Sequence, residues 1–213
     1  MTPDKLSVDE TQPDNPLTNL LGPDSATIGR LHETLSAKAA EAGLLDLAYR
    51  TVDSPLGSLL LVASDRGLTR VAFASEGHDR VLAGLAATIS PRILRAPGRL
   101  DEPARELDEY FAGSRRSFDL PLDLTTTGTF RRTVQLLLPS IVYGTTVSYA
   151  ELAAKAGRPT AVRAVGSACA TNPLPIVVPC HRVLRSDGSL SGYLGGLPAK
   201  RALLELESRG QFS

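Results

Sequence analysis

The feature that most constrains the fold is the segment VSYAELAAKAGRPTAVRAVGSACA, residues 147–170. Ser148 and Glu151 have the spacing of a capping box, in which the two residues satisfy backbone N–H groups at the start of a helix. Apolar residues then recur at helical spacing until Gly157-Arg158-Pro159, where proline cannot continue the helix. A second helix follows, with Thr160 as its predicted N-cap. Two short helices joined by a tight, glycine-containing turn predict a helix-turn-helix.

The two faces of the predicted second helix differ in composition. The inward stripe is Val162, Val165, Gly166 and Cys169. The outward side carries Ala161, Ala164 and Ala168, with Arg163 and Ser167 beside them. A helix that reads the major groove needs long polar side chains for base edges, whereas small ones let the backbone approach a narrow minor groove. We expect Thr160, Ala161, Ala164 and Ser167 to contact double-stranded DNA there with low sequence specificity; a plain helical hairpin in a core is the alternative.

The charge of the chain is unevenly distributed, although 23 basic and 23 acidic residues balance overall. Between Thr125 and Ser186 the only acid is Glu151, which leaves a local net charge of +6. The bases of this region are Arg131, Arg132, Lys155, Arg158, Arg163, Arg182 and Arg185. A surface that faces phosphates needs such an excess, so the charge supports DNA binding over an ordinary solvated face.

The first half of the chain changes pattern several times. Residues 1–24 are rich in Pro, Asp, Asn and Thr, which predicts a disordered tail. Residues 25–44 predict a helical extension, with Ser25 as N-cap and Gly43 as its end. Short β-type runs separated by DSPLG and DRG turns predict an antiparallel meander over residues 45–73. Residues 78–89 and 102–113 predict helices, and residues 116–124 an edge strand because Pro121 would interrupt a ladder.

These elements divide the chain into two domains of an α+β protein. We expect a mixed sheet-and-helix domain over residues 45–124, in which we find no residue that suggests chemistry and which we interpret as a scaffold. A helical domain over residues 125–213 begins with a helix in residues 127–141. Its apolar face is Phe130, Val134, Leu137, Leu138 and Ile141.

Composition narrows the class of protein. The 213 residues are 42% hydrophobic, and no apolar run approaches the roughly 20 residues of a membrane span. Two cysteines, Cys169 and Cys180, are too few for a disulfide scaffold, which favours a cytoplasmic protein. The three histidines, His32, His78 and His181, lie far apart, so we expect no metal site.

The segment NPLPIVVPCHRVL, residues 172–184, contains the chemistry of the chain. Three prolines stiffen an apolar run that presents Cys180 next to His181. A cysteine reacts as the thiolate, so a nearby imidazole is a natural base for it. Adjacent residues of an extended segment point to opposite faces, and a direct bond between the two side chains therefore requires the backbone to turn or a water to intervene.

The second half resembles the O6-alkylguanine-DNA alkyltransferases. The residues that carry the resemblance are RAVG at 163–166, NP at 172–173, PCHR at 179–182 and GYLGG at 192–196. The resemblance covers about residues 45–207 and implies a ribonuclease-H-like N-terminal domain followed by a winged-helix-like domain. It further implies irreversible, single-turnover transfer of an alkyl group from O6-alkylguanine, and from O4-alkylthymine, in DNA to Cys180, with no cofactor.

The relay of this family joins cysteine, water, histidine and glutamate, and Glu207 is the acid that matches. In LPAKRALLELE, Glu207 follows Leu203 by four residues and so shares the inward helical face, where a carboxylate needs a partner. Its partner is His181 in this interpretation; an ion pair with Lys200 or an arginine is the alternative. Asn172 is expected to bond near the nucleophile, as in the family, or to act as a helix C-cap.

The resemblance also assigns the residues that handle the flipped base. Arg163 matches the arginine finger that fills the gap left in the duplex, and Tyr149 matches the tyrosine that protonates the departing guanine, although periodicity alone makes Tyr149 a core residue. Leu194 replaces a small hydroxyl residue, so a backbone N–H would have to make that contact. The expected substrate pocket consists of Pro175, Val183, Tyr193, Leu194 and Gly195.

Three other functions compete with this one. An alkyltransferase-like protein binds alkylated DNA without repairing it, but carries a bulky aromatic residue at the position of Cys180. A helix-turn-helix regulator would sense methylation through an N-terminal zinc-binding cysteine domain, and residues 1–50 contain no cysteine. A cysteine hydrolase needs an oxyanion hole that nothing here suggests. We expect Cys169 to be a buried, inert thiol and the protein to be a monomer, and leave cooperative binding to DNA open.

Overall fold

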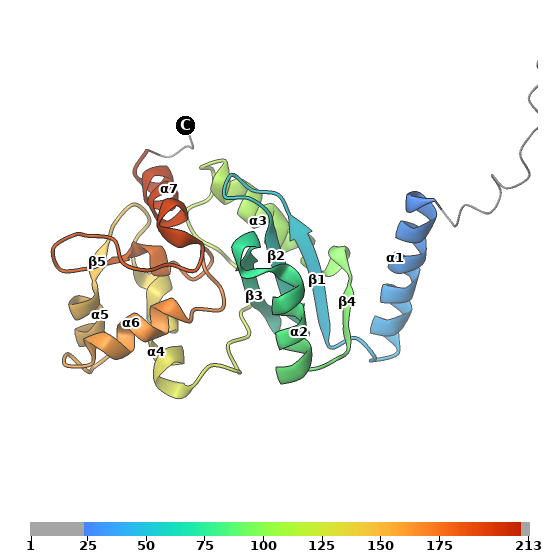
Figure 1. The fold of residues 1–213 in the computed structure, drawn as a ribbon, viewed down its shortest axis with the longest axis horizontal. Helices are drawn as coiled ribbons and strands as arrows, with labels where there is room; N and C mark the ends of the chain where they lie inside the picture. The colour runs from blue at the N-terminus through green and yellow to red at the C-terminus, as the bar shows by residue number, and fades with distance from the viewer. Residues whose placement is uncertain (1–23, 210–213) are drawn as a thin grey trace, which may run out of the picture.

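The fold is that of a computed structural model of the chain, and the structure describes residues 24–209. The predicted disordered tail lies outside the described residues, apart from Asp24. No helix in this part of the chain has the length and apolar character needed to cross a membrane. Figure 1 shows a sheet-containing half and a helical half side by side, with one further helix at the N-terminal end.

The sheet has the order β3-β2-β1-β4. Strands β1 (Leu47–Val52), β2 (Leu59–Ser64) and β3 (Gly67–Phe73) are antiparallel neighbours, which confirms the predicted meander. The fourth strand, β4 (Ile93–Arg95), runs parallel to β1 and was not predicted. With only three residues, β4 is too short for an alternating pattern to be recognised in the sequence.

The two faces of the sheet bury different layers because successive strand residues point to opposite sides. One face carries Leu47, Leu60, Val62 and Ala72 and is covered by α2 (His78–Thr88). The other face carries Leu59, Leu61, Val71 and Phe73. It packs on α3 (Asp101–Phe111) and on side chains of the helical half. Since both faces are covered, the central strand β2 is apolar and buried continuously from Leu59 to Ala63.

Helix α1 (Ser25–Glu41) lies beside β4, as Figure 1 shows. The Ser36 hydroxyl donates a hydrogen bond of 2.8 Å to the Arg95 carbonyl oxygen. The predicted cap at Ser25 is wrong, because the helix begins one residue earlier than we expected. The Asp24 carboxylate accepts a bond of 2.6 Å from the Thr27 N–H and so occupies the capping position.

The segment that we predicted as an edge strand does lie along the free edge of β3. Leu68 donates to the Pro121 carbonyl oxygen at 2.8 Å and accepts from the Asp123 N–H at 2.9 Å. Pro121 contributes only its carbonyl, which is how a proline is tolerated at a sheet edge. Gly67 makes this approach possible, because a Cβ there would lie 2.2 Å from the Pro121 oxygen.

The helical half confirms the predicted helix-turn-helix. Helix α5 (Tyr149–Lys155) and helix α6 (Val162–Ala170) are joined by the turn over residues 156–161. The capping box is present, since the Ser148 hydroxyl accepts from the Glu151 N–H and the Glu151 carboxylate accepts from the Ser148 N–H. The other elements are α4 (Thr129–Leu137), β5 (Val147–Ser148), β6 (Val183–Leu184) and α7 (Gly196–Arg209). Strands β5 and β6 pair in parallel.

Three predicted details of α6 are wrong. Ala161 is its N-cap, and no side chain caps the helix, so Thr160 does not have that role. Ala168, predicted to face outward, is fully buried, and its carbonyl oxygen accepts a bond of 3.2 Å from Gln135 of α4. Val162, predicted to face inward, is 37% exposed. The buried arc of α6 is therefore centred on Val165, Ala168 and Cys169, which rotates the helix relative to our prediction.

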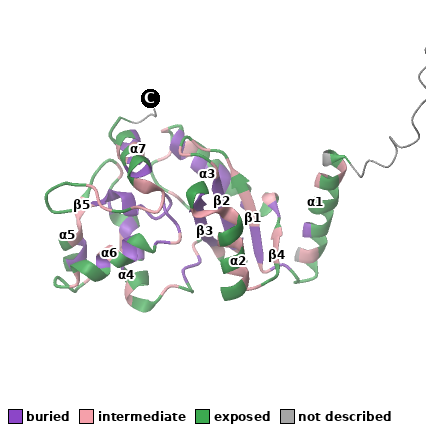
Figure 2. Cartoon of the chain, in the orientation of Figure 1, coloured by how far each residue is buried: buried purple, intermediate pink, exposed green. Residues whose placement is uncertain are grey.

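The hydrophobic core is continuous between the two halves. Figure 2 shows buried residues on the inner sides of α3, α4 and α7 and along the strands. One cluster joins Phe73, Leu107 and Tyr110 of the first half to Ile141 and Leu206 of the second. The sheet-containing half therefore packs directly behind the segment that carries Cys180.

Candidate active site

The loop that precedes Cys180 is held by the side chain of Asn172, which is fully buried. Its amide nitrogen donates to the Val178 carbonyl oxygen at 2.7 Å, and its amide oxygen accepts from the Leu174 N–H at 3.1 Å. Ile176, inside the same loop, has φ of 76°, a conformation that costs a β-branched residue about 1–3 kcal/mol. The bonds of Asn172 and the packing of a buried loop hold this strained turn in place.

Cys180 begins a short 3-10 turn, Cys180–Arg182, and is 3% exposed. Its sulfur accepts a hydrogen bond of 3.2 Å from the Asn172 amide nitrogen. Burial raises the pKa of the thiol to about 11, although the bond from Asn172 and the positive charge of Lys200 act in the opposite direction. At neutral pH the resting residue is therefore a thiol, and it reacts only if a base removes its proton.

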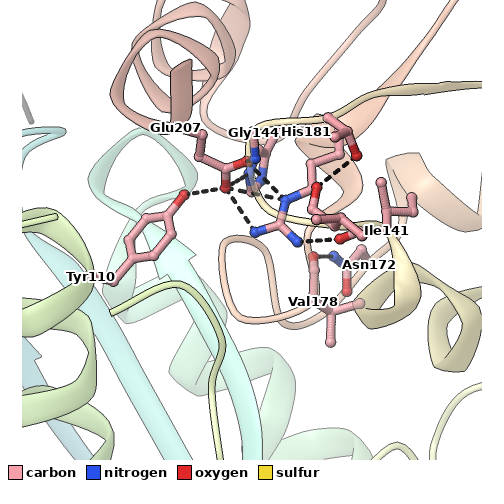
Figure 3. A network of polar contacts seen from close by, with 10 residues as sticks. Tyr110, Ile141, Gly144, Asn172, Val178, His181 and Glu207 are labelled. Atoms are coloured by element: carbon pink, nitrogen blue, oxygen red, sulfur yellow. Dashed lines mark hydrogen bonds and ion pairs between the residues drawn. The ribbon is translucent and has the colours of Figure 1, made fainter. Parts of the chain in front are cut away.

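His181 is fully buried and turned toward α7. Its Nε2 atom lies 2.9 Å from Oε1 of Glu207 (Figure 3). The hydrogen bonds of the described residues include none between Cys180 and the His181 ring, and Nδ1 of that ring is buried without a protein partner. The 3-10 turn does not bring the adjacent thiol and imidazole into direct contact, as we anticipated for neighbouring residues.

Glu207 is 5% exposed and accepts hydrogen bonds from four residues. His181, Arg182 and the Tyr110 hydroxyl bond to Oε1, at 2.9, 2.9 and 2.7 Å. The Gly144 N–H and Nε of Arg182 bond to Oε2, at 3.1 and 2.9 Å. Figure 3 shows the donors converging on the carboxylate from several elements. The predicted contact with His181 and the alternative ion pair with an arginine are thus both present.

The electrostatics of this network keep the acid charged and the imidazole neutral. Burial by itself raises the pKa of Glu207, but the bonds from His181 and Arg182 outweigh it and lower the pKa to about 2. Burial lowers the pKa of His181, and the opposing effect of Glu207 does not compensate for it. A neutral imidazole beside a carboxylate can accept a proton and be stabilised once it is charged.

Besides Arg182, the buried cation Lys200 lies near the site, on the same helix as Glu207. Lys200 is 1% exposed, and its ammonium group donates to the Val183 carbonyl oxygen at 2.7 Å. Burial lowers the pKa of Lys200. Lys200 does not contact Glu207, so the ion pair that we considered between them is absent from the hydrogen bonds described here. Cys169 is buried as predicted, and burial raises its pKa to about 12.

The residues expected to form the substrate pocket differ in exposure. Pro175 and Val183 are buried, whereas Tyr193, Leu194 and Gly195 are half-buried. The Tyr193 ring makes edge contacts with Phe73, at 5.6 Å between centroids, and with His181, at 6.4 Å. A Cβ at Gly195 would lie 2.7 Å from the Phe73 ring, so β3 presses directly on this loop.

Tyr149 lies at the start of α5 and is half-buried. Its hydroxyl bonds to the Ser191 hydroxyl at 2.5 Å. Burial raises the pKa of Tyr149, so the phenol keeps its proton at neutral pH. The side chain is therefore neither a plain core residue nor a surface one, since it presents a protonated oxygen at the edge of the loop that contains Tyr193.

The outer side of the helix-turn-helix exposes Arg163, Ala164, Ser167 and Thr160, while Ala161 is half-buried. Most of the predicted basic residues are also exposed, with one exception. Arg182 is 5% exposed and is held by Glu207 and by the Ile141 carbonyl oxygen at 2.6 Å, so it does not belong to the basic surface. Its charge neutralises the buried carboxylate instead.

Sequence reasoning missed three residues of the network around Glu207: Tyr110, Arg182 and Gly144. Arg182 belongs to the PCHR motif, but it was counted only among the basic residues expected to face DNA. Tyr110 is 97 residues away from Glu207 in the chain, and no sequence pattern connects the two. The only signal was a tyrosine in a strongly amphipathic helix, which indicates a buried ring but not the partner of its hydroxyl. No cluster of three or more potential metal ligands occurs within residues 24–209.

A thiol next to a helix-turn-helix with a basic outer surface is the arrangement of a protein that carries out chemistry on DNA. Two family models match the chain in agreement with this class. Residues 47–124 match the ribonuclease-like domain of 6-O-methylguanine DNA methyltransferase, and residues 129–209 match its DNA-binding domain. The chain belongs to the 6-O-methylguanine DNA methyltransferase family, which confirms the resemblance noted in the sequence.

Relatives cover most of the chain. The methylated-DNA–protein-cysteine methyltransferase of Mycolicibacterium paratuberculosis is 43% identical over 76% of this chain and 93% of its own. The constitutive enzyme of that name from Bacillus subtilis is 38% identical over 73% of this chain and 92% of its own. The crystal structure of Mycobacterium tuberculosis OGT in complex with DNA is 41% identical, covers 78% of this chain and 96% of its own, and has a TM-score of 0.67. The two-domain α+β fold is therefore the fold of these enzymes.

Proposed function

We propose that this protein repairs DNA by transferring an alkyl group, typically methyl, directly from O6-alkylguanine to Cys180. O4-alkylthymine is a second substrate of the same chemistry. The bond between carbon and the base oxygen breaks as the bond between carbon and sulfur forms. The observation that carries this proposal is a buried thiol bonded by Asn172 and followed by a buried His181–Glu207 pair in a DNA-binding domain of this family.

The proton of the thiol passes to His181 through a water molecule, because the imidazole has no direct bond to the sulfur. Glu207 stabilises the imidazolium that results, as the orienting acid of a catalytic triad does. The phenol of Tyr149, which keeps its proton, supplies a proton to the guanine as it departs. Asn172 holds the sulfur in line with the alkyl carbon.

The substrate base reaches Cys180 only after it leaves the stack, since the thiol is buried. The exposed Arg163 of α6 fills the gap, and Ala164 and Ser167 let the helix approach the minor groove closely. Because the helix contacts the DNA backbone and recognises the shape of the groove, the sequence specificity is low. The protein acts as a monomer in the cytoplasm.

The two domains divide this work at about residue 125. Residues 125–213 bind DNA and react, and residues 45–124 support them, preceded by an extension at 25–44 and a tail at 1–24. The product on Cys180 is a thioether, which thiol exchange cannot reverse. Cys169 lies on the buried side of α6 and gives no route to regenerate the Cys180 thiol. Each molecule therefore reacts once.

The test of the reaction is intact-protein and peptide mass spectrometry after incubation with duplex DNA that contains one O6-methylguanine. Transfer of a methyl group adds about 14 Da to the peptide that contains Cys180. Cys180→Ala abolishes the adduct and keeps DNA binding, whereas the matched control Cys169→Ala retains both. An adduct that persists in Cys180→Ala moves the nucleophile elsewhere, and DNA binding with no adduct in the unaltered protein favours a non-catalytic damage-binding protein.

The finger role of Arg163 is tested by comparing two substrates. Arg163→Ala slows the reaction with alkylated duplex DNA, but leaves the reaction with free O6-benzylguanine unchanged because a free base needs no flipping. Lys155→Ala is the matched control, since it removes one exposed positive charge from the same helix-turn-helix. Equal losses on both substrates argue against the role. Affinity for DNA falls steeply with salt if phosphate contacts dominate, and salt-independent binding contradicts such contacts.

A further inference from the structure

Tyr110 is the one side chain of the sheet-containing half that bonds to Glu207 among the residues described here. It lies in the last turn of α3 and is fully buried. Its hydroxyl donates to Oε1 of Glu207 at 2.7 Å (Figure 3). Burial and the charge of Glu207 both raise the pKa of Tyr110, so the phenol stays protonated and acts only as a donor to this carboxylate.

The Tyr110 ring is held by aromatic neighbours from both halves of the protein. Its centroid lies 5.5 Å from that of Phe111, 5.3 Å from Phe118 and 6.1 Å from Tyr143. Edge-to-face and tilted contacts of this kind restrict a ring to one orientation. The hydroxyl is therefore fixed in place before any substrate arrives.

The oxygen that Tyr110 contacts is the one that faces the imidazole. Oε1 of Glu207 lies 2.9 Å from His181 Nε2, whereas Oε2 is bonded by the Gly144 N–H. A donor on Oε1 spreads its negative charge and makes it a weaker acceptor for the imidazole proton. Tyr110 thus acts on the pKa of His181 through Glu207, in addition to fixing the direction of the carboxylate.

We propose that Tyr110 is a positioning residue of the alkyl-transfer relay, so that the sheet-containing half contributes to the chemistry as well as to folding. This inference rests on the function proposed above. It revises our interpretation of residues 45–124 as a scaffold without chemistry. The relay extends from Cys180 and His181 through Glu207 to Tyr110 and so crosses the boundary between the two halves.

The experiment compares Tyr110→Phe with Tyr143→Phe. Phenylalanine keeps the ring and its packing and removes only the hydroxyl. Tyr143 is a matched control because its ring neighbours that of Tyr110 and its own hydroxyl is buried without a hydrogen-bond partner in the described part of the chain. Both variants remove one phenolic oxygen from the same aromatic cluster.

The first readout is the imidazole titration, followed by NMR on protein labelled with ¹⁵N-histidine. The chain has three histidines, so the signal of His181 is assignable by one substitution. Without the Tyr110 hydroxyl, Glu207 becomes a stronger acceptor, and the His181 midpoint moves to higher pH by about one unit, or about tenfold in the protonation equilibrium. Tyr143→Phe leaves the midpoint where it is in the unaltered protein.

The second readout is the pH dependence of alkyl transfer from free O6-benzylguanine. The acidic limb of the rate profile moves in Tyr110→Phe in the same direction as the His181 midpoint, because only the neutral imidazole accepts the thiol proton. Superimposable titrations and profiles in both variants, with only the unfolding midpoint lowered in Tyr110→Phe, would show a purely structural tyrosine and overturn the proposal.

Failure of the function itself gives a different result. If the unaltered protein forms no adduct on Cys180, the proposed function is wrong whatever the tyrosine does. If the adduct forms but the titration of His181 is insensitive to Tyr110→Phe, the function stands and the positioning role is wrong.

Discussion

The pH dependence of stability should reveal the buried carboxylate of Glu207. Its pKa falls from an ordinary 4.5 to about 2 in the folded protein, because the bonds from His181 and Arg182 outweigh the effect of burial. A lowered pKa means that the unfolded chain takes up this proton first as the pH falls. The stabilisation is therefore complete above pH 4.5 and is lost between pH 4.5 and about 2.

The size of the effect follows from the two pKa values. A difference from 4.5 to about 2 corresponds to about 3 kcal/mol in the free energy of unfolding. Glu207→Gln removes the titrating group and leaves the Arg182 guanidinium without a carboxylate counter-charge at every pH. In the unaltered protein, Arg182 loses the same negative charge once the Glu207 carboxylate is protonated. The gap in stability between the two should therefore be widest at neutral pH and narrow by about 3 kcal/mol as the pH approaches 2.

Urea unfolding followed by circular dichroism from pH 7 to pH 2.5 measures this gap directly. Glu205→Gln is the matched control, because it makes the same change at an exposed position of α7 and should give a curve parallel to that of the unaltered protein. A gap for Glu207→Gln that does not change with pH would refute the reasoning, since it would mean that the buried carboxyl is not ionised in the folded protein.

Three further predictions concern the loops around the thiol. Gly195→Ala places a Cβ 2.7 Å from the Phe73 ring and should cost about 1–3 kcal/mol in urea unfolding, whereas Gly192→Ala, with no atom within 4 Å, should cost far less; equal costs would contradict the predicted clash. Asn172→Ala leaves the buried Leu174 N–H without its partner and removes one of the two hydrogen bonds to the Val178 carbonyl oxygen, which also accepts from the Cys180 N–H. It should lower the free energy of unfolding by about 1–3 kcal/mol and slow the reaction with O6-benzylguanine; an unchanged unfolding midpoint would argue against this. Burial lowers the pKa of His181, so the contribution of the neutral imidazole to stability is present above pH 6.5 and is lost as the pH falls below it. His181→Gln should therefore flatten the dependence of the free energy of unfolding on pH below 6.5. An unchanged dependence would show that the imidazole is not buried in its neutral form.

Local patterns were sufficient to predict most of the helices and strands. The capping box at Ser148, the break at Gly157 and the meander over residues 45–73 depend on residues close in sequence, and the structure contains all three. The strand β4 was missed because three residues show no period. The prediction that Ala168 faces outward was wrong, because small residues carry little information about which side of a helix is buried. The packing of α6 on α4 determines which side that is.

The sequence by itself determined the family and the neighbourhood of the thiol. Asn172, Cys180 and His181 lie within ten residues of one another in a stiff, proline-rich segment, so their proximity follows from chain connectivity. Glu207 could be assigned to an inward helical face because it follows Leu203 by four residues, and a carboxylate on that face needs a partner. The sequence left open whether that partner is His181, Lys200 or an arginine.

Only the tertiary structure shows that His181 and Arg182 both bind the Glu207 carboxylate and that the Tyr110 hydroxyl is a further donor to it. The two residues joined by the Tyr110–Glu207 bond are 97 positions apart and lie in different halves of the protein. A contact at that separation depends on how the two halves pack, and neither helix shows it in its own pattern. The burial that raises the pKa of Cys180 and lowers that of His181 has the same origin, because it is produced by the core that the two halves share.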